Sequence, residues 1–209
     1  MRDGIQSTVV DHLIRALRQL GDPSSLPAWG RASATLDHMG AKLSDVVLQA
    51  GVNYEAFVRP RVQRIHASYP EGATSTGFLR VLDVVGPEVV LGIARGRKLR
   101  TIRELTEFLV AEEIDTPSEL RKWLMKQGNP VRLRQVHGVG PKSVSFLKLL
   151  VGLDAVAVDI HILRFVAGAG CTARDPDKVE ELLSQAAHHL GMRVEQVDAL
   201  VWRSMAGNV

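Results

Sequence analysis

Apolar side chains recur every three or four positions through most of this chain, which is the period of an α-helix. One such run covers residues 9–20 and ends at the turn-forming residues 21–25, and another covers residues 99–109. No segment of useful length alternates apolar and polar residues as a half-buried strand does. The pattern therefore predicts an all-α fold.

Helix-start signals divide this pattern into shorter elements. Residues 116–119, Thr-Pro-Ser-Glu, have the spacing of a capping box and predict a helix that runs to Gln127. Asp175 followed by Pro176 predicts a second start, with the apolar positions between residues 179 and 190 facing inward. Pro60 lies inside the helical run 54–65, so we expect a turn or a kink there.

The segment 136–143, Val-His-Gly-Val-Gly-Pro-Lys-Ser, joins two of these predicted helices. Residues 130–136 are predicted to form a short helix with Asn129 as its N-cap, and the apolar residues 143–151 a buried one. The two glycines allow a tight turn with exposed amides, and Pro141 suits the first position of the second helix. Exposed amides at a helix N-terminus attract phosphate oxygens, and such contacts hold a nucleic-acid backbone without recognising its sequence.

Seventeen residues after Lys142 comes Asp159, within the sequence Val-Asp-Ile-His. The two segments together resemble the helix-hairpin-helix DNA glycosylases of base-excision repair, the HhH-GPD superfamily that includes endonuclease III-like and 8-oxoguanine glycosylase-like enzymes. The resemblance implies that Lys142 is a nucleophile and Asp159 the essential carboxylate. It also implies that a hairpin binds DNA phosphate through five residues, namely Gly138, Val139, Gly140, Lys142 and Ser143.

The chemistry of these two side chains agrees with those roles. An unprotonated lysine amine can attack the sugar C1′ and expel the base, and the resulting iminium permits strand cleavage by β-elimination. The apolar residues around 144–147 and the positive end of a helix would disfavour the ammonium form of Lys142. Asp159 would stabilise the oxocarbenium charge that develops on the sugar. Because the target carbon lies inside a stacked duplex, the nucleotide must first rotate out, at a cost of roughly a few kcal/mol.

The resemblance implies further features of the fold and the site. The expected fold has two helical lobes, residues 40–154 and residues 1–39 with 155–209, with Lys142 facing Asp159 across the cleft between them. Gln49, Asn53 and Tyr54 are candidates for the base pocket or for the wedge that fills the space left by a flipped base. The backbone carbonyls of Arg134, Val136 and Val139 are candidates for a monovalent cation site, because carbonyl oxygens suit a hard cation.

Composition limits the other possibilities. The chain has 209 residues, a formal net charge of +3 and one cysteine, Cys171, so a disulfide framework and a multi-cysteine transition-metal site are excluded. We therefore expect no iron–sulfur cluster and no required cofactor. Arginine is dense in residues 59–64 and 95–100, where DNA contacts are expected. We expect a monomeric cytoplasmic protein of the bacterial nucleoid that binds double-stranded DNA with a damaged or modified base, and no membrane contact.

Several alternatives stay open at this point. The lysine could merely contact DNA while Asp159 assists a water molecule, which would make a monofunctional glycosylase. The chain could also be a non-catalytic helix-hairpin-helix module that binds DNA for a partner. Asp159 could serve only as an N-cap, His161 only in the same helix start, and His137, where relatives usually have proline, has no assigned role.

Overall fold

The computed structural model describes residues 2–21, 34 and 36–206, and the regular secondary structure in those ranges is helical, with no strand among them. The all-α prediction is confirmed. The predicted turn 21–25 lies, from residue 22 on, outside the described residues. Within the described part of the chain, no helix combines the length and the apolarity needed to span a membrane. The chain divides into two compact units, residues 1–30 with 154–209 and residues 31–153.

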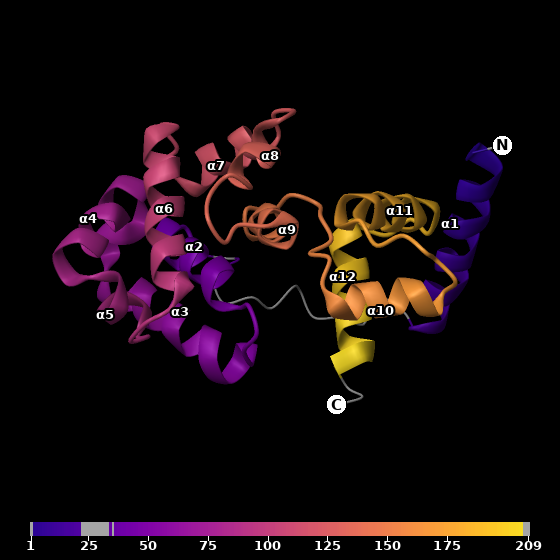
Figure 1. The fold of residues 1–209 in the computed structure, drawn as a ribbon, viewed down its shortest axis with the longest axis horizontal. Helices are drawn as coiled ribbons and strands as arrows, with labels where there is room; N and C mark the ends of the chain where they lie inside the picture. Colours follow the sequence, from indigo (N-terminus) through magenta and orange to yellow (C-terminus); the bar gives the residue numbers. More distant parts are fainter. Residues whose placement is uncertain (1, 22–33, 35, 207–209) are drawn as a thin grey trace. The chain divides into compact units, whose positions relative to one another are not determined.

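Unit 1 combines both ends of the chain (Figure 1). The first helix packs against helices from the other end of the sequence, and their apolar faces form one core that includes Leu13, Leu17, Val179, Leu183 and Val201. In the helix Pro176–His189, the predicted inward positions are confirmed, although Leu190 is only partly buried. The helices of unit 1 are α1 (Arg2–Gln19), α10 (Ile160–Gly168), α11 (Pro176–His189) and α12 (Val194–Ala206).

Unit 2 is built around one buried helix, α2 (Met39–Leu48), all 10 residues of which are buried. Figure 1 shows this helix surrounded by its neighbours in the unit, and α3, α4, α6 and α9 all contact it. The remaining elements are the π-helix η2 (Tyr54–Val58), α3 (Arg59–Ser68), the 3₁₀-helix η3 (Pro70–Ala73), α4 (Ser75–Val85), α5 (Pro87–Leu91), α6 (Arg97–Ala111), α7 (Pro117–Leu124), α8 (Asn129–Leu133) and α9 (Pro141–Leu150).

Two of the predicted helix starts are confirmed. Thr116 and Glu119 form a reciprocal capping box at the start of α7, and the Asp175 side chain caps α11. Helix α7 ends at Leu124 rather than Gln127, because the chain tightens there and Gly128 adopts a left-handed conformation with φ of 85°. The predicted break near Pro60 is the change from the π-helix η2 to the α-helix α3, which begins at Arg59.

Lys42 is buried in α2, and its ammonium donates hydrogen bonds to the Leu150 carbonyl at 2.7 Å and to the Ala34 carbonyl at 3.2 Å. The first of these bonds satisfies a carbonyl at the C-terminal end of α9. Burial away from water lowers the pKa of Lys42 from 10.5 to about 8, although the nearby carboxylates of Asp37 and Asp45 oppose that shift.

We expect the Lys42→Met variant to lose part of the pH dependence of stability. Between pH 8 and 10.5 the unfolded chain keeps the Lys42 proton and the folded chain does not, so wild-type stability rises with pH by up to about 3 kcal/mol. Urea unfolding at both ends of that range measures the rise. It should be smaller in Lys42→Met and unchanged in Lys122→Met, which alters an exposed lysine of α7. An equal rise in all three proteins would contradict the assignment.

Candidate nucleic-acid interface and catalytic residues

The turn between α8 and α9 is compact and closed by its own backbone. The side chains of Val136 and Val139 are buried, and the Val139 amide donates to the Val136 carbonyl at 3.0 Å. Gly138 between them has a φ of 80°, a conformation that strongly favours glycine. Pro141 begins α9, as predicted, and Gly140 precedes it without any side-chain cap on the first amides of the helix.

The predicted N-cap of α8 is wrong by one residue. Gly128 holds the cap position in a left-handed conformation, and Asn129 is the first helical residue. Its side-chain amide donates to the Trp123 carbonyl at 3.0 Å, which ties α8 to the end of α7. Helix α8 also ends at Leu133 instead of Val136, because the chain after Leu133 leaves the helical path to form the turn.

Helix α6 holds this turn in place. The Thr101 side chain lies so close to Gly138 that a Cβ added there would come within 2.3 Å of its hydroxyl oxygen. Glu104, one turn further along α6, accepts the His137 amide at 3.3 Å and pairs with Arg100 at 2.5 Å. The hydrogen bond from Arg100 and the one from the His137 amide lower the pKa of Glu104. The exposed His137 therefore joins the turn to α6 through its backbone.

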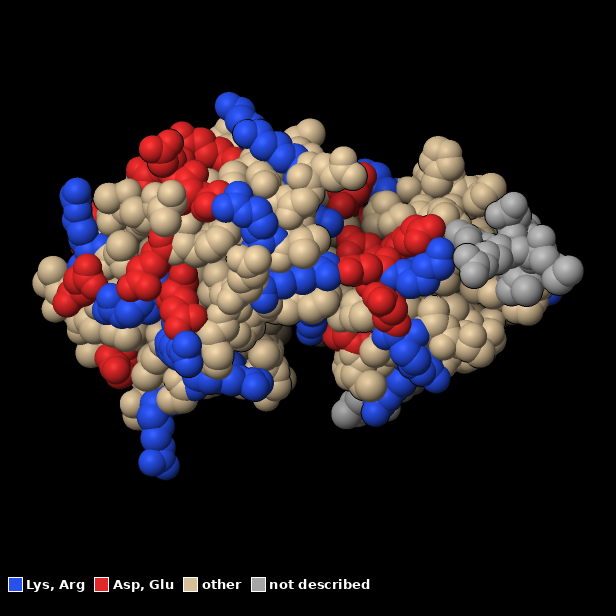
Figure 2. Space-filling model, turned by 45° about the horizontal axis from the view of Figure 1, so that its top comes forward, with Lys and Arg blue, Asp and Glu red and all other residues tan. Residues whose placement is uncertain are grey.

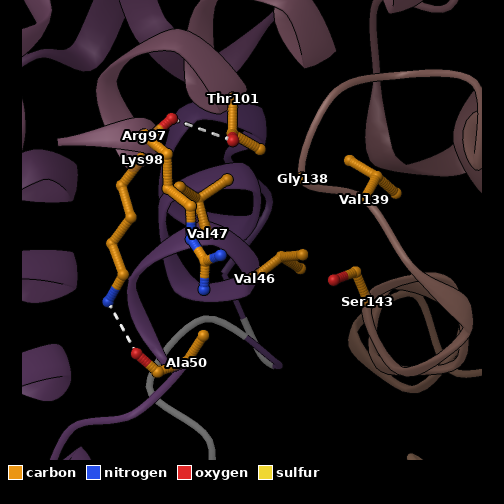
Figure 3. Close-up of a pocket in the computed structure, with 9 residues that line it drawn as sticks. All are labelled: Val46, Val47, Ala50, Arg97, Lys98, Thr101, Gly138, Val139 and Ser143. Atoms are coloured by element: carbon orange, nitrogen blue, oxygen red, sulfur yellow. Dashed lines mark hydrogen bonds between the residues drawn. The ribbon is translucent and has the colours of Figure 1, made fainter.

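A cavity of about 150 Å³ opens between this turn, the end of α2 and the start of α6, all within unit 2. In Figure 3 the Arg97 guanidinium and the Ser143 hydroxyl point into it from opposite sides. The walls between them include four apolar side chains, those of Val46, Val47, Ala50 and Val139. The cavity thus combines basic, hydroxyl and apolar side chains. Its lining consists of Val46, Val47, Ala50, Arg97, Lys98, Thr101, Gly138, Val139 and Ser143.

Lys98 also borders this cavity, but its ammonium is engaged. It donates to the carbonyls of Leu48 at 2.6 Å and Ala50 at 2.9 Å, which closes the C-terminal end of α2. Burial, followed by the neighbouring charge of Arg97, lowers the pKa of Lys98. Lys98 is thus structural, and Arg97 is the cation of this cluster that is directed into the cavity.

The arginines of residues 59–64 mainly support the fold. Arg59 pairs with Glu55 at 2.5 Å. Arg61 donates to the Phe57 carbonyl and Arg64 to the Val90 carbonyl at the end of α5. In Figure 2, basic and acidic side chains are interspersed over the visible face of each unit. The positive charge on that face is therefore distributed rather than gathered in one patch.

The three candidate pocket or wedge residues lie at and after the end of α2. Gln49 is the C-cap of α2. The Asn53 side chain accepts the Ala56 amide at 2.9 Å and caps η2, and the Tyr54 hydroxyl donates to Asp45 at 3.0 Å. Ala50, one residue after Gln49, lines the cavity of unit 2. Asn53 and Tyr54 therefore make local contacts that shape the segment after α2.

The two candidate catalytic residues belong to different units, and each is described within its own. Lys142 is the second residue of α9 in unit 2, and its side chain is partly buried. Asp159 in unit 1 is the N-cap of α10, and its Oδ1 accepts the amides of His161 at 2.9 Å and Ile162 at 3.1 Å. The predicted capping role of Asp159 is confirmed, and its carboxylate is held at a defined place.

The carbonyl positions considered for a monovalent cation lie along the turn that precedes α9. Arg134 is the C-cap of α8, and the Val136 carbonyl accepts the Val139 amide. A carbonyl oxygen has a second lone pair, so this bond still leaves the Val136 carbonyl able to bind a hard cation. Among the described residues, no group of three His, Cys, Asp or Glu side chains is arranged to hold a metal ion.

A family model described as a domain of unknown function (DUF8548) matches residues 92–206, which is more than half of the chain. The chain therefore belongs to this family. The matched region includes α6, the turn before α9, and both Lys142 and Asp159. No curated protein and no solved structure matches the chain.

We expect Gly138→Ala to destabilise unit 2 and Gly140→Ala to leave it intact. An alanine at 138 would be strained by the positive φ and would collide with Thr101, so a loss of roughly 1–3 kcal/mol is expected. Gly140 has an ordinary extended backbone, and a Cβ there would meet nothing within 4 Å. Thermal and urea unfolding measure both. Equal stability of the two variants would contradict the described turn, and Thr101→Ala should partly rescue Gly138→Ala.

Proposed function

We propose that this member of the DUF8548 family is a DNA glycosylase that flips out and removes a damaged or modified base, and that it cleaves the resulting abasic site through a Schiff base on Lys142. The observation that carries the proposal is Gly140. The fold does not require glycine there, because its φ of −104° is open to any residue and a Cβ would meet nothing within 4 Å. A bare backbone at that point suits close approach of a ligand.

The ligand that suits this backbone is a DNA phosphate. Gly140 lies at the N-terminus of α9, where the amides and the helix dipole favour an anion. In the adjoining cavity of unit 2, Arg97 and Ser143 supply two further hydrogen-bond donors. Contacts of this kind bind the DNA backbone without reading sequence, as an enzyme that searches for a rare base requires.

Lys142, two residues after Gly140, provides the nucleophile. Its Nζ lone pair attacks the sugar C1′, the bond from C1′ to the base breaks, and the base leaves with the electron pair and takes up a proton. Loss of a proton from the amine and opening of the sugar ring give a protonated imine between Nζ and C1′. Removal of a C2′ proton then expels the 3′ phosphate, and water finally releases the lysine.

Asp159 provides the counter-charge. Within unit 1 its orientation is set by the two amides of α10 that bind Oδ1, so the carboxylate is already fixed at the start of that helix. A carboxylate beside the reacting sugar stabilises the positive charge that develops as the base departs. A monovalent cation held by the carbonyls of Arg134, Val136 and Val139 would add positive charge beside the phosphate, and the steps above do not depend on it.

A panel of duplexes, each with one oxidised, deaminated, alkylated or abasic site, tests this proposal. The proposal predicts that the protein releases at least one base and that strands break without added alkali. Strand breaks only after alkali would identify the monofunctional alternative, in which Asp159 assists water. Binding without base release would identify the non-catalytic DNA-binding module. In such a module, Asp159 would act only as the N-cap of α10.

A variant at position 140 separates binding from folding in the same assay. Gly140→Val should still fold, because the backbone there is extended and a Cβ meets nothing within 4 Å. If a phosphate approaches that backbone, the added side chain should weaken duplex binding. Unchanged binding by a folded Gly140→Val protein would remove the observation on which the proposal rests.

A further inference from the structure

The four residues that precede Asp159 form a buried segment that lies outside the helices of unit 1. Ala155, Val156, Ala157 and Val158 are each at most 6% exposed, and none of them belongs to a helix or a strand. Buried backbone amides need acceptors, which helices and sheets normally supply. In this segment the acceptors come largely from side chains of other helices.

Two carboxylates accept consecutive amides of the segment. Asp198 of α12 is itself buried, with 6% of its surface exposed, and its Oδ1 accepts the Ala157 amide at 3.1 Å. Glu180 of α11 accepts the Val156 amide at 3.4 Å. The Val158 amide then bonds back to the Val156 carbonyl at 2.9 Å, which forms a tight turn around Ala157. The chain therefore reaches Asp159 along a fixed path.

We propose that Asp198 is a positioning residue for Asp159, an inference that rests on the proposed function. Asp159 is held from two directions. Its backbone is fixed from upstream, because Asp198 binds the amide two residues before it. Its side chain is fixed from downstream, because the first amides of α10 bind Oδ1. A carboxylate that must lie beside a reacting sugar requires such fixation, since misplacement by about 1 Å can reduce a rate roughly 100-fold.

Stability alone does not favour a carboxylate at position 198. Moving a charged group out of water costs several kcal/mol, and apolar replacements for buried charges are often neutral or stabilising. A hydrogen bond from an amide to an ionised carboxylate is stronger than one between neutral groups and holds the amide more firmly. The benefit of Asp198 is thus a defined backbone position at Ala157, which lies two residues from the proposed catalytic carboxylate.

The test compares Asp198→Ala and Asp198→Asn in single-turnover base excision, with rates expressed per folded protein. We expect Asp198→Ala to slow excision roughly 10- to 100-fold, because the Asp159 carboxylate is displaced. Duplex affinity should stay unchanged, because the turn before α9 in unit 2 is not altered. Asp198→Asn keeps an acceptor oxygen and should recover most of the rate. Leu183→Ala, which opens the same core but keeps both carboxylates that bind the segment, controls for instability, and Glu181→Gln controls for loss of an exposed acid on α11.

A rate for Asp198→Ala equal to that of the wild type, or an equal loss in Leu183→Ala, would overturn the positioning role. Amide hydrogen exchange tests the same role without activity. In Asp198→Ala the amides of Ala157, His161 and Ile162 should all exchange faster than in Leu183→Ala, because loosening the backbone of Asp159 loosens its cap. Unchanged exchange at His161 and Ile162 would contradict the inference. A wild type that excises no base would refute the proposed function, and the exchange result would then decide separately whether Asp198 orders Asp159.

Discussion

Lys142→Ala is expected to abolish strand cleavage at a preformed abasic site, with a fall of roughly 10³-fold or more, because the nucleophile is removed and no Schiff base can form. The substitution removes a partly buried side chain from the first turn of α9, where alanine is a good helix former, so the fold should persist. Cleavage is measured on a duplex with a single abasic site, with thermal unfolding as the check on folding.

Two variants sharpen this measurement. Lys142→Arg keeps a positive charge at the start of α9 without a nucleophilic amine, so it should bind the duplex and fail to cleave it. Lys148→Ala removes a lysine from the last turn of the same helix and should cleave like the wild type. Wild-type cleavage by folded Lys142→Ala would show that the lysine has no covalent role and would leave only the monofunctional and non-catalytic alternatives.

Asp159→Asn is expected to reduce base excision by about 10²- to 10³-fold while stability is preserved. Asparagine is as good an N-cap as aspartate, so the amides of His161 and Ile162 keep an acceptor. The variant therefore removes the negative charge and leaves the helix start. Asp159→Ala removes both and should also lose about 1 kcal/mol of stability. Excision rates and urea unfolding, measured on the same preparations, separate the two roles.

If Asp159→Asn excises bases as fast as the wild type, the carboxylate is only a cap, and the charge plays no part in the reaction. A parallel loss of stability and activity in Asp159→Asn would likewise contradict a specific electrostatic role. Asp175→Asn, which makes the same change at the N-cap of α11, is the matched control and should alter neither property.

The sequence predicted those parts of the fold and the site that depend on local chemistry. A capping box needs only Thr116 and Glu119 at the right spacing, and an Asp-Pro helix start needs only adjacent residues, so both were found. The capping role of Asp159 is local in the same sense. The wrong prediction of Asn129 as an N-cap has a local cause too. Gly128 adopts the left-handed conformation and takes the cap position instead of Asn129.

Other features depend on residues that are far apart in the sequence, so no local pattern predicts them. The helices α4 and α5 were not predicted. Lys42 appears as one more surface lysine until α2 is found to be buried on all sides, with the Leu150 carbonyl beside it. The contact between Thr101 and Gly138 joins positions 37 residues apart. The arginines at 61 and 64 resembled a DNA-binding cluster, yet they bind backbone carbonyls whose positions only the fold defines.

Borohydride trapping on a duplex with a lesion or an abasic site, followed by peptide mapping of the adduct, tests the central claim most directly. Reduction converts a Schiff base into a stable amine, so the DNA remains attached to the residue that attacked it. The account predicts one covalent adduct, on the peptide that contains Lys142, and its disappearance in Lys142→Ala. An adduct at another lysine, such as Lys148 or the buried Lys42, would contradict it. The absence of any adduct on a duplex that the protein cleaves would also contradict it.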